Sequence, residues 1–174
     1  SYKMSEIKKL WSKIESDVEN TERKGLMAKS LLDKVGLSLG MDTFDGKKIL
    51  IQAIEDSESI HESDFPRWDG VEFKIRDISK VQKAITLKLH NLELEDIFNA
   101  LISDLYNNLL EAEDNIDAVR YFISTLNKWY EFFKKFNVNV LPEQRQRGIY
   151  GELYFLKNHV LPHCAGRDSL ASWG

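Results

Sequence analysis

The fold class is decided by the stretch from Val71 to His90, which reads VEFKIRDISKVQKAITLKLH. Apolar and polar residues alternate in its first half and again from Ile85 onwards. A period of two is typical of strands that have one buried and one solvent-exposed face. The connection between the two halves, from Asp77 to Lys83, is short. The stretch therefore predicts an antiparallel β-hairpin.

The segments before this hairpin extend the prediction to an α+β fold. Residues 47–55 form an apolar, β-branched run after the turn signal Asp45-Gly46, and they predict another strand. We therefore expect a small antiparallel sheet of roughly three to five strands between about residues 36 and 91. Residues 56–69 are rich in Asp, Glu and Ser and predict a polar loop. An apolar stripe at helical spacing predicts an amphipathic helix at about residues 5–19, before the sheet.

Three helices are expected after the sheet. The first is predicted by the apolar spacing of Ile97, Leu101, Leu105 and Leu109. The second begins near Asp114, with Asp117 three residues on in the manner of a capping box. Its expected apolar stripe consists of Ile116, Val119, Ile123, Leu126, Tyr130 and Phe133. The third is predicted at residues 142–161, because Pro142 suits a first helical position and Pro162 stops the pattern.

Composition and charge narrow the class of protein. Apolar residues make up 43% of the chain and charged residues 30%, as in ordinary globular proteins. No apolar run approaches the roughly 20 residues needed to span a bilayer, and there is no signal-peptide core at the start. Together with a lone Cys164, this predicts a cytoplasmic protein without a membrane segment. Residues 1–140 hold 20 basic and 25 acidic residues, so they show no net basic footprint for DNA.

A motif near the end of the sequence carries a family resemblance. Residues 141–156 read LPEQRQRGIYGELYFL, and residues 171–174 read ASWG. This pattern resembles a bacterial family of PD-(D/E)XK-motif proteins found in phage-defence and restriction gene neighbourhoods. Gln144, Ile149 and Tyr150 are mild departures from the pattern of that family. The resemblance implies a restriction-endonuclease-like protein, with the helix at 142–161 as the first helix of the nuclease core.

The resemblance also implies a division of the chain and a set of site residues. It divides the chain into an amino-terminal α+β domain, residues 1–137, and the start of a nuclease-like core, residues 138–174, which stops before the catalytic acids. Glu152 is the implied catalytic and metal-binding carboxylate, and Arg145 and Arg147 are the implied DNA-binding residues. Each has a plainer alternative, because a buried Glu also pairs with backbone or Arg, and arginines near a helix start are often surface residues.

The implied activity is Mg²⁺-dependent hydrolysis of DNA by the complete protein, with no cofactor in this chain alone. A helicase, ATPase or methyltransferase of a defence operon is the implied partner. An alternative function is a non-catalytic interaction module that recruits a helicase or ATPase, which the acidic balance of residues 1–140 favours. The chain would then need no metal.

Other candidate sites are weaker. Asp69, Glu72 and Lys74 mimic the nuclease motif, but the two acids are only three residues apart and Asp69-Gly70 is a turn signal. His159, His163 and Cys164 fall short of the roughly four ligands of a structural zinc site. The sequence contains no phosphate-binding glycine loop, nucleophile elbow or His-Glu-x-x-His motif, so those enzyme classes are excluded.

Overall fold

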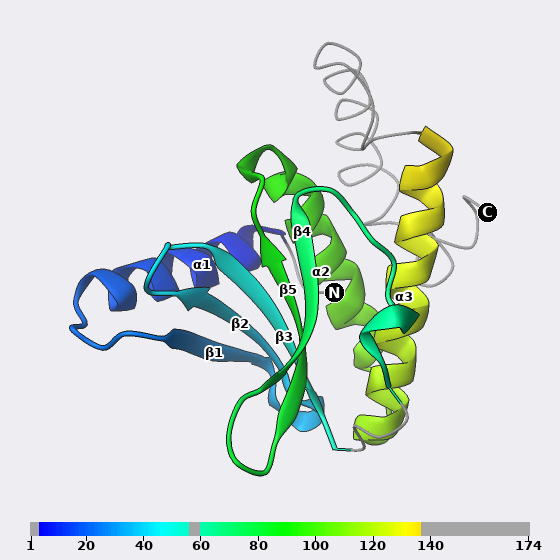
Figure 1. Ribbon diagram of the computed structural model, residues 1–174, viewed down its shortest axis with the longest axis horizontal. Coiled ribbons are helices and arrows are strands. Elements are labelled where there is room, and N and C mark those ends of the chain that lie inside the picture. Colours follow the sequence, from blue (N-terminus) through cyan, green and yellow to red (C-terminus); the bar gives the residue numbers. More distant parts are fainter. Residues whose placement is uncertain (1–3, 56–59, 137–174) are drawn as a thin grey trace.

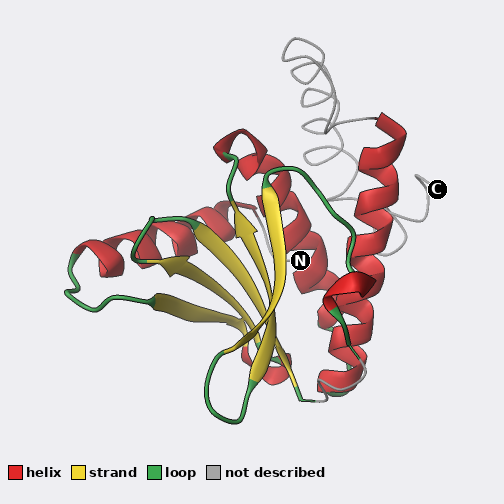
Figure 2. Ribbon diagram, viewed as in Figure 1, coloured by secondary structure: helices red, strands yellow, loops and turns green. Residues whose placement is uncertain are grey.

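The computed structural model describes residues 4–55 and 60–136 and confirms the α+β class (Figures 1 and 2). An amino-terminal helix is followed by five strands and then by two further helices. The helices are α1 (Met4–Glu19), α2 (Glu95–Leu109) and α3 (Asn115–Phe136), and the strands are β1 (Leu26–Leu32), β2 (Leu37–Asp42), β3 (Lys48–Ile54), β4 (Val71–Asp77) and β5 (Lys83–Leu89). Short 3₁₀ turns at Asp33–Val35, Glu62–Asp64 and Leu92–Leu94 complete the order.

The five strands form one antiparallel sheet in the order β1-β2-β3-β5-β4. The β4–β5 hairpin has the predicted pairing, from Val71 opposite Leu89 to Asp77 opposite Lys83. Because β5 also pairs with β3, from Ile49 opposite Lys88 onwards, β4 lies at one edge of the sheet and β1 at the other. The hairpin is therefore attached to the rest of the sheet only through β5.

All three helices contribute to one core on one face of the sheet. The residues of β2, β3 and β5 that point to this face are fully buried together with side chains of α1, α2 and α3. Among the most deeply buried are Leu37, Leu39, Leu50, Ile85 and Leu87, each 0% exposed. The opposite face has a small separate cluster of Ile49, Ile51 and Ala84. No described helix packs on this second face, which we call the open face of the sheet.

Helix α2 lies between the other two helices and is bonded to both. Three buried side-chain hydrogen bonds make these links: Trp11 Nε1 donates to Asn99 Oδ1 at 2.9 Å, Trp129 Nε1 donates to Asp104 Oδ2 at 2.9 Å, and Asn108 Nδ2 donates to Thr125 Oγ1 at 3.0 Å. Since a buried polar group without a partner is costly, these bonds favour one alignment of the helices over neighbouring ones.

The structure confirms the predicted helices at 5–19 and 97–109 and corrects three details. The sheet begins at Leu26, because β1 precedes the predicted range. The polar loop at 56–69 contains two buried aromatic residues, Phe65 and Trp68, which anchor it to the core. Ile116 is 52% exposed, whereas Val119, Leu126 and Phe133 of the predicted stripe are buried, together with Phe122 and Trp129.

The structure shows one hydrogen bond of the capping box predicted for α3, because Asp114 Oδ1 accepts from the Asp117 amide at 2.9 Å. The predicted helix at 142–161 and the nuclease-like segment from 138 lie outside the described residues. Within the described part of the chain, each helix is too short or too polar to cross a membrane.

Candidate functional site

The nuclease-like triplet Asp69, Glu72 and Lys74 does not form a metal site in the structure. Glu72 and Lys74 project from the open face of β4, as the alternation predicted, with their charged atoms 3.8 Å apart. Glu72 also pairs with Arg76 at 3.2 Å and with His90 at 3.8 Å. Asp69 belongs to a separate turn, in which Gly70 has a φ of 87°. In this triplet the carboxylate of Glu72 is therefore shared by cationic groups, and Asp69 does not join it in a metal-binding cluster.

A second charged cluster lies on the same face, around Lys88. Its Nζ is 2.8 Å from Asp45 Oδ2 and 3.0 Å from Asp42 Oδ2. Lys88 is only 8% exposed, although the alternation of β5 predicted a solvent-exposed position. The prediction is wrong here because Lys88 lies on an inner strand, where Asp42 and Asp45 pack against its ammonium group.

The protonation states of this cluster follow from its geometry. Burial disfavours the charged form of Lys88, but its hydrogen bonds to Asp45 and Asp42 outweigh this and raise the pKa of Lys88. Burial also acts against ionisation of Asp45, yet the hydrogen bond from Lys88 prevails and lowers the pKa of Asp45. Lys88 and Asp45 are thus held in their charged forms, and Asp42 contacts the same ammonium group.

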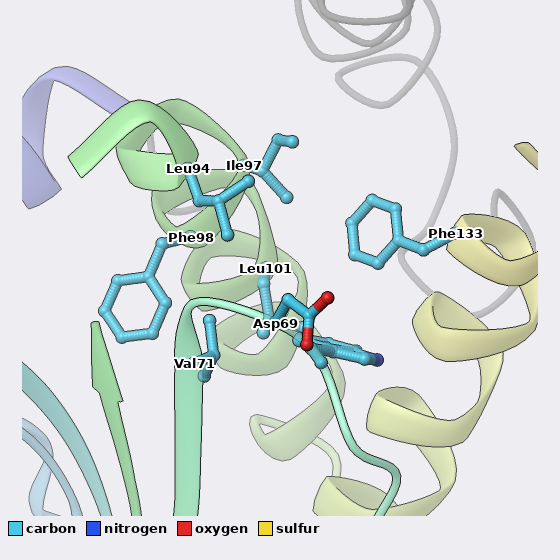
Figure 3. Close-up of a pocket in the computed structure, with 8 residues that line it drawn as sticks. Asp69, Val71, Leu94, Ile97, Phe98, Leu101 and Phe133 are labelled. Atoms are coloured by element: carbon cyan, nitrogen blue, oxygen red, sulfur yellow. The ribbon is translucent and has the colours of Figure 1, made fainter. Parts of the chain in front are cut away.

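An apolar pocket opens beside Asp69, between the start of β4 and helices α2 and α3 (Figure 3). Its lining is Trp68, Asp69, Val71, Leu94, Ile97, Phe98, Leu101 and Phe133. Trp68 Nε1 is buried and has no hydrogen-bond partner in the described part of the chain. The described residues of the lining are apolar except for Asp69, whose carboxylate is the one charged group among them.

Asp104 is a buried titratable group that sequence reasoning missed. It is 5% exposed on α2, and its carboxylate accepts the Trp129 hydrogen bond. Burial raises the pKa of Asp104 to about 6, although the Trp129 bond and the charge of Lys128 act in the opposite direction. The signal in the sequence was a charged residue between Leu101 and Leu105, on the predicted apolar stretch.

The described residues offer no metal centre: residues 4–55 and 60–136 contain no group of three or more His, Cys, Asp or Glu side chains that could hold an ion. Glu152, Arg145 and Arg147 lie outside these ranges, and so do His159, His163 and Cys164. No metal site is therefore evident among the described residues. We assign no hydrolytic step to them.

Comparison with known proteins supplies the family. A family model described as "Putative PD-(D/E)XK family member" (DUF4420) matches residues 7–174. The chain belongs to this family. The match covers the described residues from Ile7 onwards as well as the motif at 141–156, and thus almost all of the chain. No curated protein and no solved structure matches the chain.

One DUF4420 family model covers both the α+β domain and the motif at 141–156. Residues 7–136 of the match include the five-stranded sheet and the helices α2 and α3, and most of α1. The described domain is therefore a regular part of DUF4420 proteins rather than an unrelated neighbour of the motif. Any role for the domain has to be compatible with the role of the motif.

Proposed function

We propose that the protein is a Mg²⁺-dependent DNA endonuclease of a restriction or phage-defence system, acting in the cytoplasm. Residues 1–137 serve as its amino-terminal domain, and the segment from 138 contributes to the nuclease-like core. The observation that supports the proposal is the family match over residues 7–174, which joins the domain to the motif around Glu152. In this proposal Glu152 binds the metal, and Arg145 and Arg147 contact DNA phosphates, to which guanidinium groups bind well.

The test is cleavage of plasmid DNA by the full-length gene product, with Mg²⁺ or with a chelator. We expect cleavage that requires Mg²⁺ and is lost in Glu152→Gln, because the amide is a poor replacement for a charged metal ligand. Glu143→Gln, an acid in the same motif, is the matched control and should retain cleavage. Cleavage that persists in Glu152→Gln, or no Mg²⁺-dependent cleavage at all, would contradict the proposal.

A second candidate function is a non-catalytic module that recruits a helicase or ATPase. It is favoured by the open face of the sheet, where the charged groups around Lys88 and Glu72 flank an apolar centre in which Ile49, Ile51 and Ala84 are buried and Leu26 is exposed. An apolar centre with a polar rim is the usual anatomy of a protein interface. Leu26 lies on this face beside Ile51 and is 45% exposed.

Co-purification with the helicase or ATPase of the same operon tests this candidate. Leu26→Glu should abolish the complex, because it places a charge in the apolar centre. Leu110→Glu is the matched control, since Leu110 is 43% exposed but lies at the end of α2, away from this face. Equal binding by both variants and the wild type would exclude the open face as the docking surface.

A further inference from the structure

The β4–β5 hairpin concentrates positive charge in an otherwise acidic chain. Residues 71–90 contain five Lys or Arg and two Asp or Glu, a net charge of +3. The whole chain has a net charge of −4, so all other residues together carry −7. The five cations are Lys74, Arg76, Lys80, Lys83 and Lys88. The acidic average of residues 1–140 thus conceals a local basic segment.

The charges that lack partners lie at the tip of this hairpin. Lys74 and Arg76 share Glu72, and Lys88 is held by Asp42 and Asp45. Lys80 and Lys83 are exposed, and neither has an ion-pair partner in the described part of the chain. These two cations are therefore available to bind an anion without breaking an existing pair.

The tip also presents apolar side chains to solvent. The turn is closed by a hydrogen bond from the Ile78 amide to the Gln82 carbonyl at 2.9 Å. Between them Val81 is 96% exposed, and Ile78 itself is 46% exposed. In Figure 1 this turn extends beyond the remainder of the sheet, so the tip can reach a large ligand without a clash from the helices.

A protruding two-stranded ribbon with cations around an apolar tip matches the shape and chemistry of a DNA groove. Such a ribbon fits the major groove, and ribbon-forming proteins also enter the minor groove with an apolar wedge. We propose that the β4–β5 hairpin is a DNA-binding ribbon, in which Lys80 and Lys83 contact phosphates and Val81 packs into the groove. The choice of DNA as ligand rests on the proposed function.

An anionic membrane surface is the competing ligand for a tip of this kind. Membrane binding scales with the apolar area inserted, and each lysine near an anionic surface adds only about 1 kcal/mol. One fully exposed valine and two free lysines supply little of either. DNA gains from the same two lysines through release of counterions, which makes the binding depend steeply on salt.

The experiment measures binding of a labelled DNA duplex to the full-length protein by fluorescence anisotropy, in chelator to prevent cleavage. The wild type is compared with the double variant Lys80→Ala/Lys83→Ala over a range of salt. Losing two phosphate contacts should reduce the salt slope by about 1.8. Between about 50 and 200 mM salt the wild type should then lose about 12-fold more affinity than the variant. Unchanged thermal midpoints confirm that the variants are folded.

Two further variants separate the hairpin from general charge effects. Lys9→Ala/Lys13→Ala removes the same charge from exposed positions on α1 and should keep the wild-type salt slope. Val81→Ser should weaken binding without changing the slope, because an apolar contact releases no counterions. A hairpin variant with wild-type affinity and slope, or an equal loss in the α1 variant, would overturn the inference.

Failure of this inference is distinguishable from failure of the proposed function. If Glu152→Gln abolishes cleavage while the hairpin variants bind DNA normally, the nuclease stands and the ribbon is refuted. If the ribbon binds DNA and no cleavage occurs, the inference stands without the nuclease. Binding to vesicles of anionic phospholipid, with no measurable binding to DNA, would refute the ribbon and identify the tip as a membrane contact.

Discussion

Asp104→Asn tests whether the buried charge of Asp104, at the contact between α2 and α3, lowers the stability of the fold. Burial raises the pKa of Asp104 from 3.8 to about 6, a change of roughly two units. At 1.36 kcal/mol for each unit, the ionised carboxylate makes the fold on the order of 3 kcal/mol less stable at neutral pH than a neutral group would. An asparagine can still accept the hydrogen bond from Trp129 through its Oδ1 atom. We therefore expect the variant to be more stable than the wild type at neutral pH.

The expected pH dependence has a definite sign. The native state holds the Asp104 proton more tightly than the unfolded chain does, so between pH 3.8 and about 6 it binds more protons. Within that window this group makes the wild type less stable as pH rises, and above it the loss is complete. The stability advantage of Asp104→Asn should be small near pH 4 and reach about 2 to 3 kcal/mol near pH 7.5.

Urea unfolding at several pH values between about 4 and 7.5 measures this advantage directly. Asp77→Asn is the matched control, because it also removes one carboxylate but from an exposed position at the end of β4. Subtracting the wild-type curve removes the contribution of all other titrating groups. An advantage of Asp104→Asn over the wild type that stays constant with pH, or that is smaller at neutral pH than near pH 4, would refute the reasoning.

Two further predictions concern stability. Gly36→Ala should destabilise the fold more than Gly46→Ala, because both glycines have positive φ (80° and 70°) but a Cβ at Gly36 would lie 2.7 Å from Ala53 Cβ, whereas at Gly46 it meets open space. Thermal unfolding of both variants measures the difference, and equal midpoints would show that Ala53 moves aside. Asn99→Ala should cost about 1 to 3 kcal/mol, because it leaves Trp11 Nε1 buried without its acceptor. In a Trp11→Phe background the same substitution should cost clearly less, and equal costs in a double-mutant cycle would argue against the bond.

The elements that sequence reasoning predicted well are those with strong periodicity. The β4–β5 hairpin alternates with a period of two, and α2 repeats its leucines at helical spacing, so both were found with the correct partners or faces. Strand β1 was missed because its sequence, LMAKSLL, does not alternate and its pairing shifts between Ser30 and Leu32. An edge strand with a bulge has little pattern to detect.

The charged clusters on the open face were predictable only in part, since they depend on contacts between segments that are far apart in the sequence. The alternation of β4 placed Glu72 and Lys74 outwards correctly, and Glu72 forms ion pairs with Lys74 and Arg76 rather than a cluster of carboxylates with Asp69. The same rule failed for Lys88, because the alternation of one strand does not reveal that it lies between two others. Net charge likewise conceals the unpaired lysines at the hairpin tip, because it does not distinguish them from cations that form ion pairs in the folded structure.

The three buried polar residues of α2 show why a core keeps groups that lower its stability. Asn99 bonds to α1, while Asp104 and Asn108 bond to α3 at positions one helical turn apart. Apolar packing alone would tolerate a shift of α3 along α2, but such a shift would leave these groups without partners at a cost of about 1 to 3 kcal/mol each. Asp104→Asn keeps this alignment and removes only the charge. A more stable variant with unchanged helix packing would therefore show that the bond, and not the charge, specifies the arrangement.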